Sequence, residues 1–553
     1  IIDGGTGVDE IDGGLGDDTI NGGSGNDSID GSSGNDIISG DAGDDIINGG
    51  LGINTLFFGN ALSEIVINMA EKYSLINSVY TLDNISGTHF KTYSTNLIDQ
   101  GEDYVENIRD IIGSFQKDTI TTDAQNNYIK SGGGNDEVNI TKGENLIVTE
   151  SGEDIVNATT EIGLKNTIYL GIGNDVFIGQ NIGGNYIDGE ENSDTVDYNL
   201  ITTNGLDVDL TNKENKTINV KENNNTQIVE MTEIKTSNQE GIQYSDYIRN
   251  VENIIATEQI DILKGDDNDN RFEGRGDNDI FIGRGGNDTL IGGEGIDRIK
   301  YDYVTNSNIS IKVDLIEQTG TVDYNNPSGN ITDKDSFETV ENFTLGKGND
   351  LIINDSYKYF YNNDIDGGEG IDTITHKTYE QKVVIDLQAG TITSDIDVTN
   401  TENDSIVNVE NATGSRYGDE IKGSDEDNEI RGYDGDDKIY FSKGNDILMG
   451  EAHQDTFIHE GTVIENGIDR IDGGEGKEDK IDYSRINSSN YIIADMTSSE
   501  NLVIGKDINN VDITEDYFKV LFYNTSDDLE VTNSKDNFIR VEELYGTEGN
   551  DTL

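Results

Sequence analysis

The chain has 553 residues, and its 110 Asp and Glu residues against 37 Lys and Arg residues give a formal net charge of −73 at pH 7. It contains no Cys, which excludes a disulfide-stapled scaffold, and no apolar run approaches the ~18 residues of a membrane-spanning helix. The charge also predicts no nucleic-acid partner, because phosphate binding needs a basic surface.

Nine-residue repeats open the chain without a gap. Gly recurs at the first and fourth places, Asp or Asn stands at the sixth, and an apolar residue stands at the eighth. Glycines permit a tight six-residue loop, and the last three residues then form a short strand with one inward side chain. Two nonapeptides make one coil of 18 residues, and stacked coils pair their strands in parallel. The six consecutive copies begin at Gly4, Gly13, Gly22, Gly31, Gly40 and Gly49.

Longer segments of a second kind separate further runs of nonapeptides. Each of these spacers has an apolar–Asp/Asn–apolar triplet near its start, such as Val208-Asp209-Leu210, and a Val-Glu pair near its end, such as Val251-Glu252. The chain is therefore about five copies of one large unit, a run of nonapeptides followed by a spacer.

These patterns give the expected domain organisation. Because both ends of the sequence fall inside a nonapeptide, we expect a longer protein with more repeats on both sides. The expected segments are a nonapeptide run (1–57), a spacer (58–112), degenerate nonapeptides (113–200), a spacer (201–256), a nonapeptide run (257–300), a spacer (301–345), a short run (346–375), a spacer (376–413), a nonapeptide run (414–482), a spacer (483–545) and the start of a further run (546–553).

Stacked coils also stack the acidic loops. Asp9, Asp27 and Asp45 would form a carboxylate ladder on one edge, and Asp18 and Asp36 would form another on the opposite edge. Bare carboxylates in such ladders would repel one another. A hard divalent cation with about 6–8 oxygen ligands removes this repulsion, and calcium fits loop carbonyls and Asp carboxylates better than magnesium does.

The pattern Gly-Gly-x-Gly-x-Asp-x-apolar-x resembles the calcium-binding nonapeptide of RTX (repeats-in-toxin) proteins. The resemblance implies an all-β fold, an elongated right-handed parallel β-roll or β-helix solenoid interrupted by β-rich spacers. It also implies multiple Ca²⁺ ions, each between loops two repeats apart, held by loop carbonyls and by the sixth-place Asp.

Carried over residue by residue, the resemblance predicts two sets of metal ligands. Copies that lack the sixth-place Asp (Asn54, Asn270, Asn428) or the fourth-place Gly (Asp277, Tyr417, His453) depart from the pattern, which weakens the prediction there. The predicted Asp ligands are Asp9, Asp18, Asp27, Asp36, Asp45, Asp136, Asp154, Asp175, Asp194, Asp279, Asp288, Asp297, Asp350, Asp372, Asp419, Asp437, Asp446, Asp455, Asp469 and Asp551, and the predicted Gly ligands are Gly5, Gly7, Gly14, Gly16, Gly23, Gly25, Gly34, Gly43, Gly286, Gly293 and Gly295.

We expect no enzyme in this part of the protein. The chain has four His residues, and none stands in an HExxH motif. No Gly-x-Ser-x-Gly elbow leads a strand into a helix. We therefore predict no catalytic residue and no cofactor other than Ca²⁺.

The function expected is that of a calcium-binding structural region of a secreted bacterial surface protein, of the S-layer or large-adhesin type. The resemblance implies export from a Gram-negative bacterium by type I secretion, with folding when the chain meets extracellular calcium. Possible partners are further copies of the protein or a cell-surface glycan. Two alternatives stay open: the carrier region of an exported RTX enzyme or toxin, and a polysaccharide-active β-helix. Clustering of basic and aromatic side chains on one face would favour the polysaccharide reading.

Overall fold

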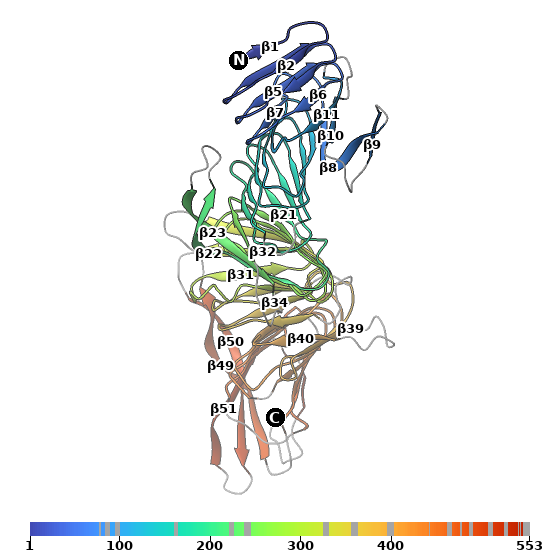
Figure 1. Cartoon of the computed structure of the whole chain (residues 1–553). Coiled ribbons are helices and arrows are strands. Elements are labelled where there is room, and N and C mark those ends of the chain that lie inside the picture. The colour runs from blue at the N-terminus through green and yellow to red at the C-terminus, as the bar shows by residue number, and fades with distance from the viewer. Residues whose placement is uncertain are drawn as a thin grey trace. The chain divides into compact units, whose positions relative to one another are not determined.

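The structure is a computed structural model that describes residues 1–76, 79–82, 89–94, 100–159, 164–219, 226–236, 245–324, 331–354, 363–394, 403–441, 443–461, 467–475, 478–485, 490–506, 512–524, 529–539, 541 and 543–545. The chain divides into two compact units, Ile1–Gly295 and Ile296–Leu553. Every regular element of the described residues is a β-strand (Figure 1). The described part of the chain accordingly has no helix that could cross a bilayer.

Short strands of three to six residues dominate the first unit, and longer ones occur only in the spacers. Its strands are β1 (Ile2–Asp3), β2 (Glu10–Asp12), β3 (Thr19–Ser24), β4 (Ser28–Asp30), β5 (Ile37–Ala42), β6 (Ile46–Asn48), β7 (Thr55–Phe57), β8 (Ile65–Ile76), β9 (Val79–Leu82), β10 (His89–Ser94), β11 (Glu102–Glu106), β12 (Asp110–Ile112), β13 (Thr119–Thr121), β14 (Tyr128–Gly133), β15 (Glu137–Ile140), β16 (Leu146–Ser151), β17 (Ile155–Ala158), β18 (Thr167–Tyr169), β19 (Val176–Gly179), β20 (Tyr186–Asp188), β21 (Thr195–Asp197), β22 (Leu206–Asn219), β23 (Thr226–Thr236), β24 (Asp246–Arg249), β25 (Asn253–Ile255), β26 (Ile262–Lys264), β27 (Arg271–Gly276), β28 (Ile280–Ile282) and β29 (Thr289–Glu294).

The second unit repeats the same alternation of short and long strands. Its strands are β30 (Arg298–Lys300), β31 (Ser310–Asp314), β32 (Thr319–Tyr324), β33 (Ile331–Glu338), β34 (Asn342–Thr344), β35 (Leu351–Ile353), β36 (Asp364–Asp366), β37 (Thr373–Thr375), β38 (Val383–Asp386), β39 (Thr391–Ser394), β40 (Asp404–Val407), β41 (Asn411–Thr413), β42 (Glu420–Lys422), β43 (Glu429–Asp434), β44 (Lys438–Phe441), β45 (Ile447–Ala452), β46 (Thr456–His459), β47 (Arg470–Asp472), β48 (Lys480–Asp482), β49 (Asn490–Lys506), β50 (Asp512–Asn524), β51 (Leu529–Ile539) and β52 (Glu543–Tyr545).

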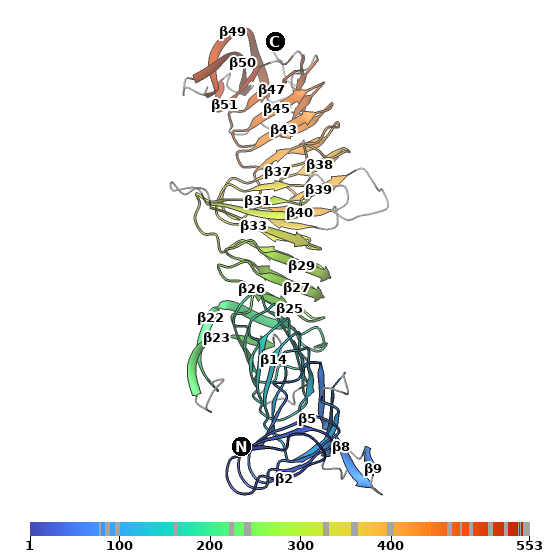
Figure 2. The ribbon, with the colours of Figure 1, turned by 90° about the horizontal axis from the view of Figure 1, so that it is seen from above.

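Successive short strands alternate between two parallel sheets. In the first run, Ile20 of β3 pairs with Ile38 of β5, and Ile11 of β2 pairs with Ile29 of β4. Both pairings join residues 18 positions apart, so one coil contains two nonapeptides. Figure 2 shows β25, β27 and β29, which follow the same pattern, side by side.

The core between the two sheets is a column of the eighth-place side chains. Ile20, Ile38 and Ile47 are fully or almost fully buried, whereas the neighbouring Ile37 is 41% exposed. The difference follows from the pleat, which turns adjacent side chains to opposite faces of the sheet. The predicted fold class, an all-β parallel β-roll with interrupting β-rich spacers, is confirmed.

Each spacer inserts an antiparallel meander into one of the parallel sheets. In the second spacer, β24 pairs in parallel with β20 of the preceding coil, and β22 pairs in parallel with β26 of the following coil. Between them, β23 pairs antiparallel with both β22 and β24. The strands of a spacer thus enter the sheet in reverse chain order, and the parallel stack continues on either side of them.

The same reversed insertion recurs in the other spacers. In the first, β11 pairs with β6, β10 lies between β11 and β8, and β8 pairs with β13. In the second unit, β40, β39 and β38 lie in this order between β36 and β42. The first residue of the triplet near the start of each of these spacers, for example Ile67, Val208 or Ile385, is buried as an eighth-place residue would be.

Replacing Ile38 by Ala should destabilise the coils around β3, β5 and β7 by about 2–5 kcal/mol, because it removes a fully buried side chain and leaves a cavity. The adjacent Ile37→Ala is the matched control and should change stability by only about 0.5 kcal/mol. Hydrogen exchange of the amides in these strands, measured in excess calcium, checks both values. Equal effects of the two variants would contradict the assignment of the core column.

Candidate metal sites in the stacked loops

The sixth-place carboxylates form hydrogen-bonded ladders along the edges of the first run. The backbone N–H of Asp9 donates to Oδ1 of Asp27 at 2.8 Å, and the N–H of Asp27 donates to Oδ1 of Asp45 at 2.7 Å. On the other edge, the N–H of Asp18 donates to Oδ1 of Asp36 at 2.8 Å. The two ladders predicted from the sequence are therefore present, and each step spans one coil.

The second oxygen of each of these carboxylates lacks a hydrogen-bond donor. Oδ2 of Asp9, Asp18, Asp27, Asp36 and Asp45 is buried, and no donor of the described residues reaches it. Burying a charged oxygen without a partner is costly. These atoms are therefore the natural place for a cation, and they fit the calcium that the sequence predicts.

Glycine at the first place of the repeat makes room for the carboxylate. A Cβ atom added to Gly22 would lie 2.8 Å from Oδ2 of Asp27, and one added to Gly31 would lie 2.6 Å from Oδ2 of Asp36. In these loops a side chain at the first place would crowd the carboxylate, whereas the degenerate repeats hold Ser131, Thr149 and Leu170 at this place and still carry Asp136, Asp154 and Asp175 in a ladder. In the first run, the first-place Gly therefore gives the carboxylate close access to the loop.

Loop carbonyls supply further oxygens on the same edges. Gly23 and Gly25 have φ angles of 101° and 131°, and a Cβ at either would collide with the carbonyl oxygen of Gly5 or Gly7 in the preceding coil. These carbonyls therefore point along the stack toward the next loop. Every Gly predicted as a ligand has positive φ: Gly5, Gly7, Gly14, Gly16, Gly23, Gly25, Gly34, Gly43, Gly286, Gly293 and Gly295. A donor set made only of carbonyl and carboxylate oxygens suits a hard cation such as calcium.

Burial changes the protonation of the ladder carboxyls. Desolvation raises the pKa of Asp45 from 3.8 to about 7, that of Asp194 to about 8 and that of Asp437 to about 9. Neighbouring carboxylates raise these pKa values further, as Asp27 does for Asp45. The ladders are therefore stable at neutral pH only if protons or a cation compensate their charge.

A longer ladder follows the first spacer. It consists of Asp118, Asp136, Asp154, Asp175 and Asp194. The backbone N–H of each of the first four residues donates to Oδ1 of the next Asp in this order, at 2.7–2.9 Å. The N–H of Asp194 then donates to Oε2 of Glu252 at 3.0 Å. The Glu of the Val-Glu pair thus takes the sixth place and ends the ladder.

The opposite edge of these same coils carries asparagine instead. The N–H of Asn127 donates to Oδ1 of Asn145, and the N–H of Asn145 donates to Oδ1 of Asn166. The side-chain amides donate as well, for example Nδ2 of Asn166 to Oδ1 of Asn185 at 2.8 Å. All four side chains are buried and uncharged, and Oδ1 of Asn145, Asn166 and Asn185 each accepts an N–H from a neighbouring Asn. Oδ1 of Asn127, at the start of the ladder, is buried without a donor from the described residues, so this edge has no carboxylate that calls for a cation.

Ladders of the same kind run through the described residues of the second unit. One runs from Asp350 through Asp372 to Glu410, and another from Asp419 through Asp437 and Asp455 to Asp479. A third connects Asn428, Asp446, Asp469 and Asp536. Oδ2 of Asp372, Asp437, Asp446 and Asp455 is buried, and the described residues offer it no donor, as in the first run.

The remaining predicted Asp ligands also lie at sixth places. Asp279 accepts from the N–H of Asp261, and Asp288 accepts from the N–H of Asn270. The N–H of Asp297 donates to Glu341, the Glu of another Val-Glu pair. Asp551 lies outside the described residues.

The first Asp after each of the first four spacers differs from the rest of its ladder, because both of its oxygens are already hydrogen-bonded. Oδ2 of Asp419 accepts from the N–H of Ser415, and its Oδ1 accepts from Val383 in the spacer. Asp350 is bonded likewise by Gly346 and Ile311. The assignment of these two residues as ligands stays a prediction, and their bonding makes them weaker candidates than the interior Asp residues.

A set of buried Asp residues inside the spacers was missed by the sequence prediction. Oδ1 of Asp246 accepts from the N–H of Asn185, and its Oδ2 accepts from the hydroxyl of Tyr198 at 2.9 Å. The equivalent residues in the other spacers are Asp103, Asp335, Asp404 and Asp536. Asp103 accepts hydrogen bonds from Asp45 and Thr92, and Asp335 accepts one from Tyr301. Asp404 accepts from Asn363 and Asn354, and Asp536 accepts from Asp469 and Tyr483.

The signal for this set was present in the sequence. Asp246, Asp335 and Asp404 each stand six residues before the Glu of a Val-Glu pair, in the pattern Asp-x-apolar-x-x-Val-Glu. A search for the nonapeptide spacing does not find them, because the half-coil between this Asp and the following Glu has six residues instead of nine. In the first spacer the same place is held by Arg109, so Val105-Glu106 there is not equivalent to the other pairs.

The described residues hold no group of three or more His, Asp or Glu side chains gathered as a metal cluster. The arrangement instead offers one carboxylate per loop together with backbone carbonyls, repeated coil after coil. Fold and site together define a solenoid whose loops are built to bind hard metal ions.

The comparison with known families identifies which kind of solenoid this is. The family model described as RTX calcium-binding nonapeptide repeat (4 copies) matches residues 1–29, 21–56, 110–139, 254–299 and 413–448. The chain is therefore a calcium-binding repeat region of the RTX type. No curated protein matches it. The ladders extend beyond the matched segments, for example to Asp154, Asp175 and Asp372.

Replacing Asp27 by Asn should lower the number of bound calcium ions by about two, because the carboxylate lies between two stacked loops. Asp30→Asn is the matched control, since it removes the same charge from an exposed side chain next to the loop. Calcium titration by calorimetry or equilibrium dialysis gives the stoichiometry of each variant. Loss of a single ion, or an equal loss in the control, would contradict the shared-loop geometry.

In calcium-free buffer, the fold should become less stable as the pH rises. The raised pKa values of Asp45, Asp136 and Asp154, each about 7, mean that the folded state binds protons more tightly than the unfolded state. Their favourable contribution is complete below pH ~4 and is lost as the pH rises through about 7. Far-UV circular dichroism between pH 4.5 and 8.5 measures this loss, and added calcium should reverse it at the upper end. A spectrum independent of pH would refute the prediction.

Proposed function

We propose that this chain is a structural region of a secreted bacterial surface protein, of the S-layer or adhesin type, and that many calcium ions hold it in shape. The observation that carries the proposal is the repeated burial of carboxylates, such as those of Asp27, Asp36 and Asp45, with one oxygen bonded and the other reached by no donor of the described residues. Each such oxygen makes a compact stack depend on a bound cation. Calcium binding free energy thereby becomes folding free energy.

The proposal also covers the route by which the protein reaches the surface. With a net charge of −73 and few apolar residues, the calcium-free chain is expanded by self-repulsion, a state suited to passage through a secretion channel. We infer type I export from a Gram-negative bacterium, because RTX proteins typically leave the cell in this way. Folding then begins where calcium is abundant.

A structural role is favoured over a catalytic one by how the repeat is used. The same unit, a stack of coils closed by an antiparallel spacer, recurs along the chain, and its buried polar groups serve the stack itself. His376, for example, lies fully buried beside Tyr379, and burial lowers its pKa to about 4. The rival role, as carrier for an enzyme or toxin encoded beyond this sequence, has no described residue that favours it.

Chelation should convert the circular dichroism spectrum from that of a β-protein to that of a disordered chain, and calcium should restore it. The expected hydrodynamic radius rises in parallel, because unscreened carboxylates repel one another. Magnesium at the same concentration is the matched control and should restore little structure. A folded spectrum in excess chelator at pH 8 would overturn the proposal.

A further inference from the structure

A row of tyrosine and apolar side chains crosses the outer face of one sheet in the first unit. Tyr128 pairs with Leu146, Leu146 with Thr167, and Thr167 with Tyr186, so these residues lie at one register position on β14, β16, β18 and β20. Their neighbours in the strands, such as Ile129 and Ile187, point into the core. The row therefore faces outward.

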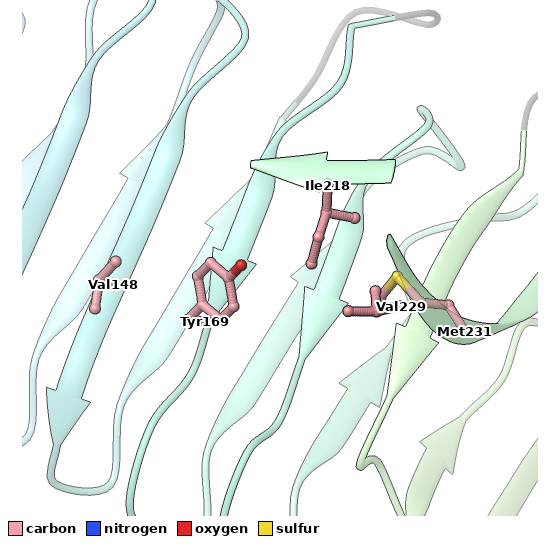
Figure 3. Close-up of a cluster of buried hydrophobic side chains, with 5 residues drawn as sticks. All are labelled: Val148, Tyr169, Ile218, Val229 and Met231. Carbon is pink, nitrogen blue, oxygen red and sulfur yellow. The ribbon is translucent and has the colours of Figure 1, made fainter. Parts of the chain in front are cut away.

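The spacer hairpin β22–β23 covers the adjacent row, and Tyr128, Leu146 and Tyr186 of this row are partly buried against that contact. Ile218, Val229 and Met231 of the hairpin pack on Val148 and Tyr169 of the sheet (Figure 3). Along the border of this contact lies a cavity of about 370 Å³. Tyr128, Leu146 and Tyr186 line it from the sheet, and Thr217 and Ile218 line it from the hairpin. Its volume is in the range of small-molecule sites, which is ~300–1,000 Å³.

Polar groups line the cavity on the side of the loops. Asn126, Glu144 and Lys165 contribute exposed side chains, and Arg109 contributes a guanidinium group. They belong to the coils whose edge is the asparagine ladder, and the buried Asp110 and Asp123 nearby are paired with Arg109 and Lys72. The opposite edge of these coils carries the acidic ladder from Asp136 to Asp194.

The charges at the cavity balance. Arg109 makes two hydrogen bonds to the carboxylate of Asp110, at 2.7 and 2.6 Å, which compensates its charge. Lys165 and Glu144 in the lining carry opposite charges, so together with the Arg109–Asp110 pair the charges at the cavity sum to zero in a chain of −73. An anionic ligand gains little here, and a cation would be drawn to the acidic edges instead. The cavity suits a neutral ligand rich in hydrogen-bonding groups.

We propose that this cavity binds a neutral oligosaccharide. A sugar ring has C–H-rich faces that pack on tyrosine rings, and hydroxyls that exchange hydrogen bonds with amide, carboxylate and ammonium groups. Tyr128 and Leu146 form the floor for a sugar ring, and Asn126, Glu144 and Lys165 contact its hydroxyls. The neighbouring Tyr186 is held in place by stacking on Tyr247, whose ring has Lys216 above it at 3.8 Å.

The binding test uses the full chain in excess calcium. Neutral hexasaccharides of glucose, mannose, galactose and N-acetylglucosamine are titrated by calorimetry, with hexagalacturonate as the acidic comparison. At least one neutral hexasaccharide should bind, and hexagalacturonate should bind at least tenfold more weakly. If no neutral hexasaccharide binds, or if hexagalacturonate alone does, the proposal is wrong.

Two variants assign the binding to this cavity. Tyr128→Ala and Glu144→Ala should each weaken binding of the neutral sugar at least tenfold, whereas Tyr128→Phe, which keeps the ring, should retain most of the affinity. Tyr417→Ala removes an exposed tyrosine of the second unit and should leave binding unchanged. Circular dichroism and calcium stoichiometry show that each variant folds. Unchanged affinity in a folded Tyr128→Ala and in Glu144→Ala would overturn the assignment.

Discussion

The buried sixth-place carboxylate is the constraint on which the rest of the structure depends. Its Oδ1 accepts a backbone N–H from the neighbouring coil, as Asp27 accepts from Asp9, and this bond sets the spacing of the loops. Its Oδ2 is buried at the same time, without a donor from the described residues. One side chain thus joins two coils and creates the need for a cation, so assembly of the stack and metal binding are the same event.

Several ladders begin or end at the spacers. One kind of ladder end is a Glu that the spacer supplies, such as Glu252. Another is a spacer Asp whose second oxygen accepts a hydrogen bond from a hydroxyl, as Asp246 accepts from Tyr198. The next ladder begins on a carboxylate that is already saturated, such as Asp419. The stack is therefore divided into blocks of coils, and the spacers supply hydrogen-bond partners at the borders between them.

The asparagine ladder shows a second solution to the same packing problem. An amide provides a donor as well as an acceptor, so Asn145 and Asn166 bond each other and leave no charge to compensate. The metal-dependent and metal-independent edges lie on opposite sides of the same coils. The tyrosine-lined cavity lies on the side of the asparagine ladder, whose first member, Asn127, contributes to its lining.

The sequence alone determined the period, the core column and the interior ladders, because a nonapeptide places Ile20 and Asp27 by local geometry repeated every coil. Only the tertiary structure decided which groups meet across the spacers. Asp45 and Asp103, or Asp194 and Glu252, are 58 residues apart, and the strand insertion between them reverses the chain order. These neighbours determine whether both oxygens of a carboxylate find a hydrogen-bond donor. The repeat period of the sequence does not predict them.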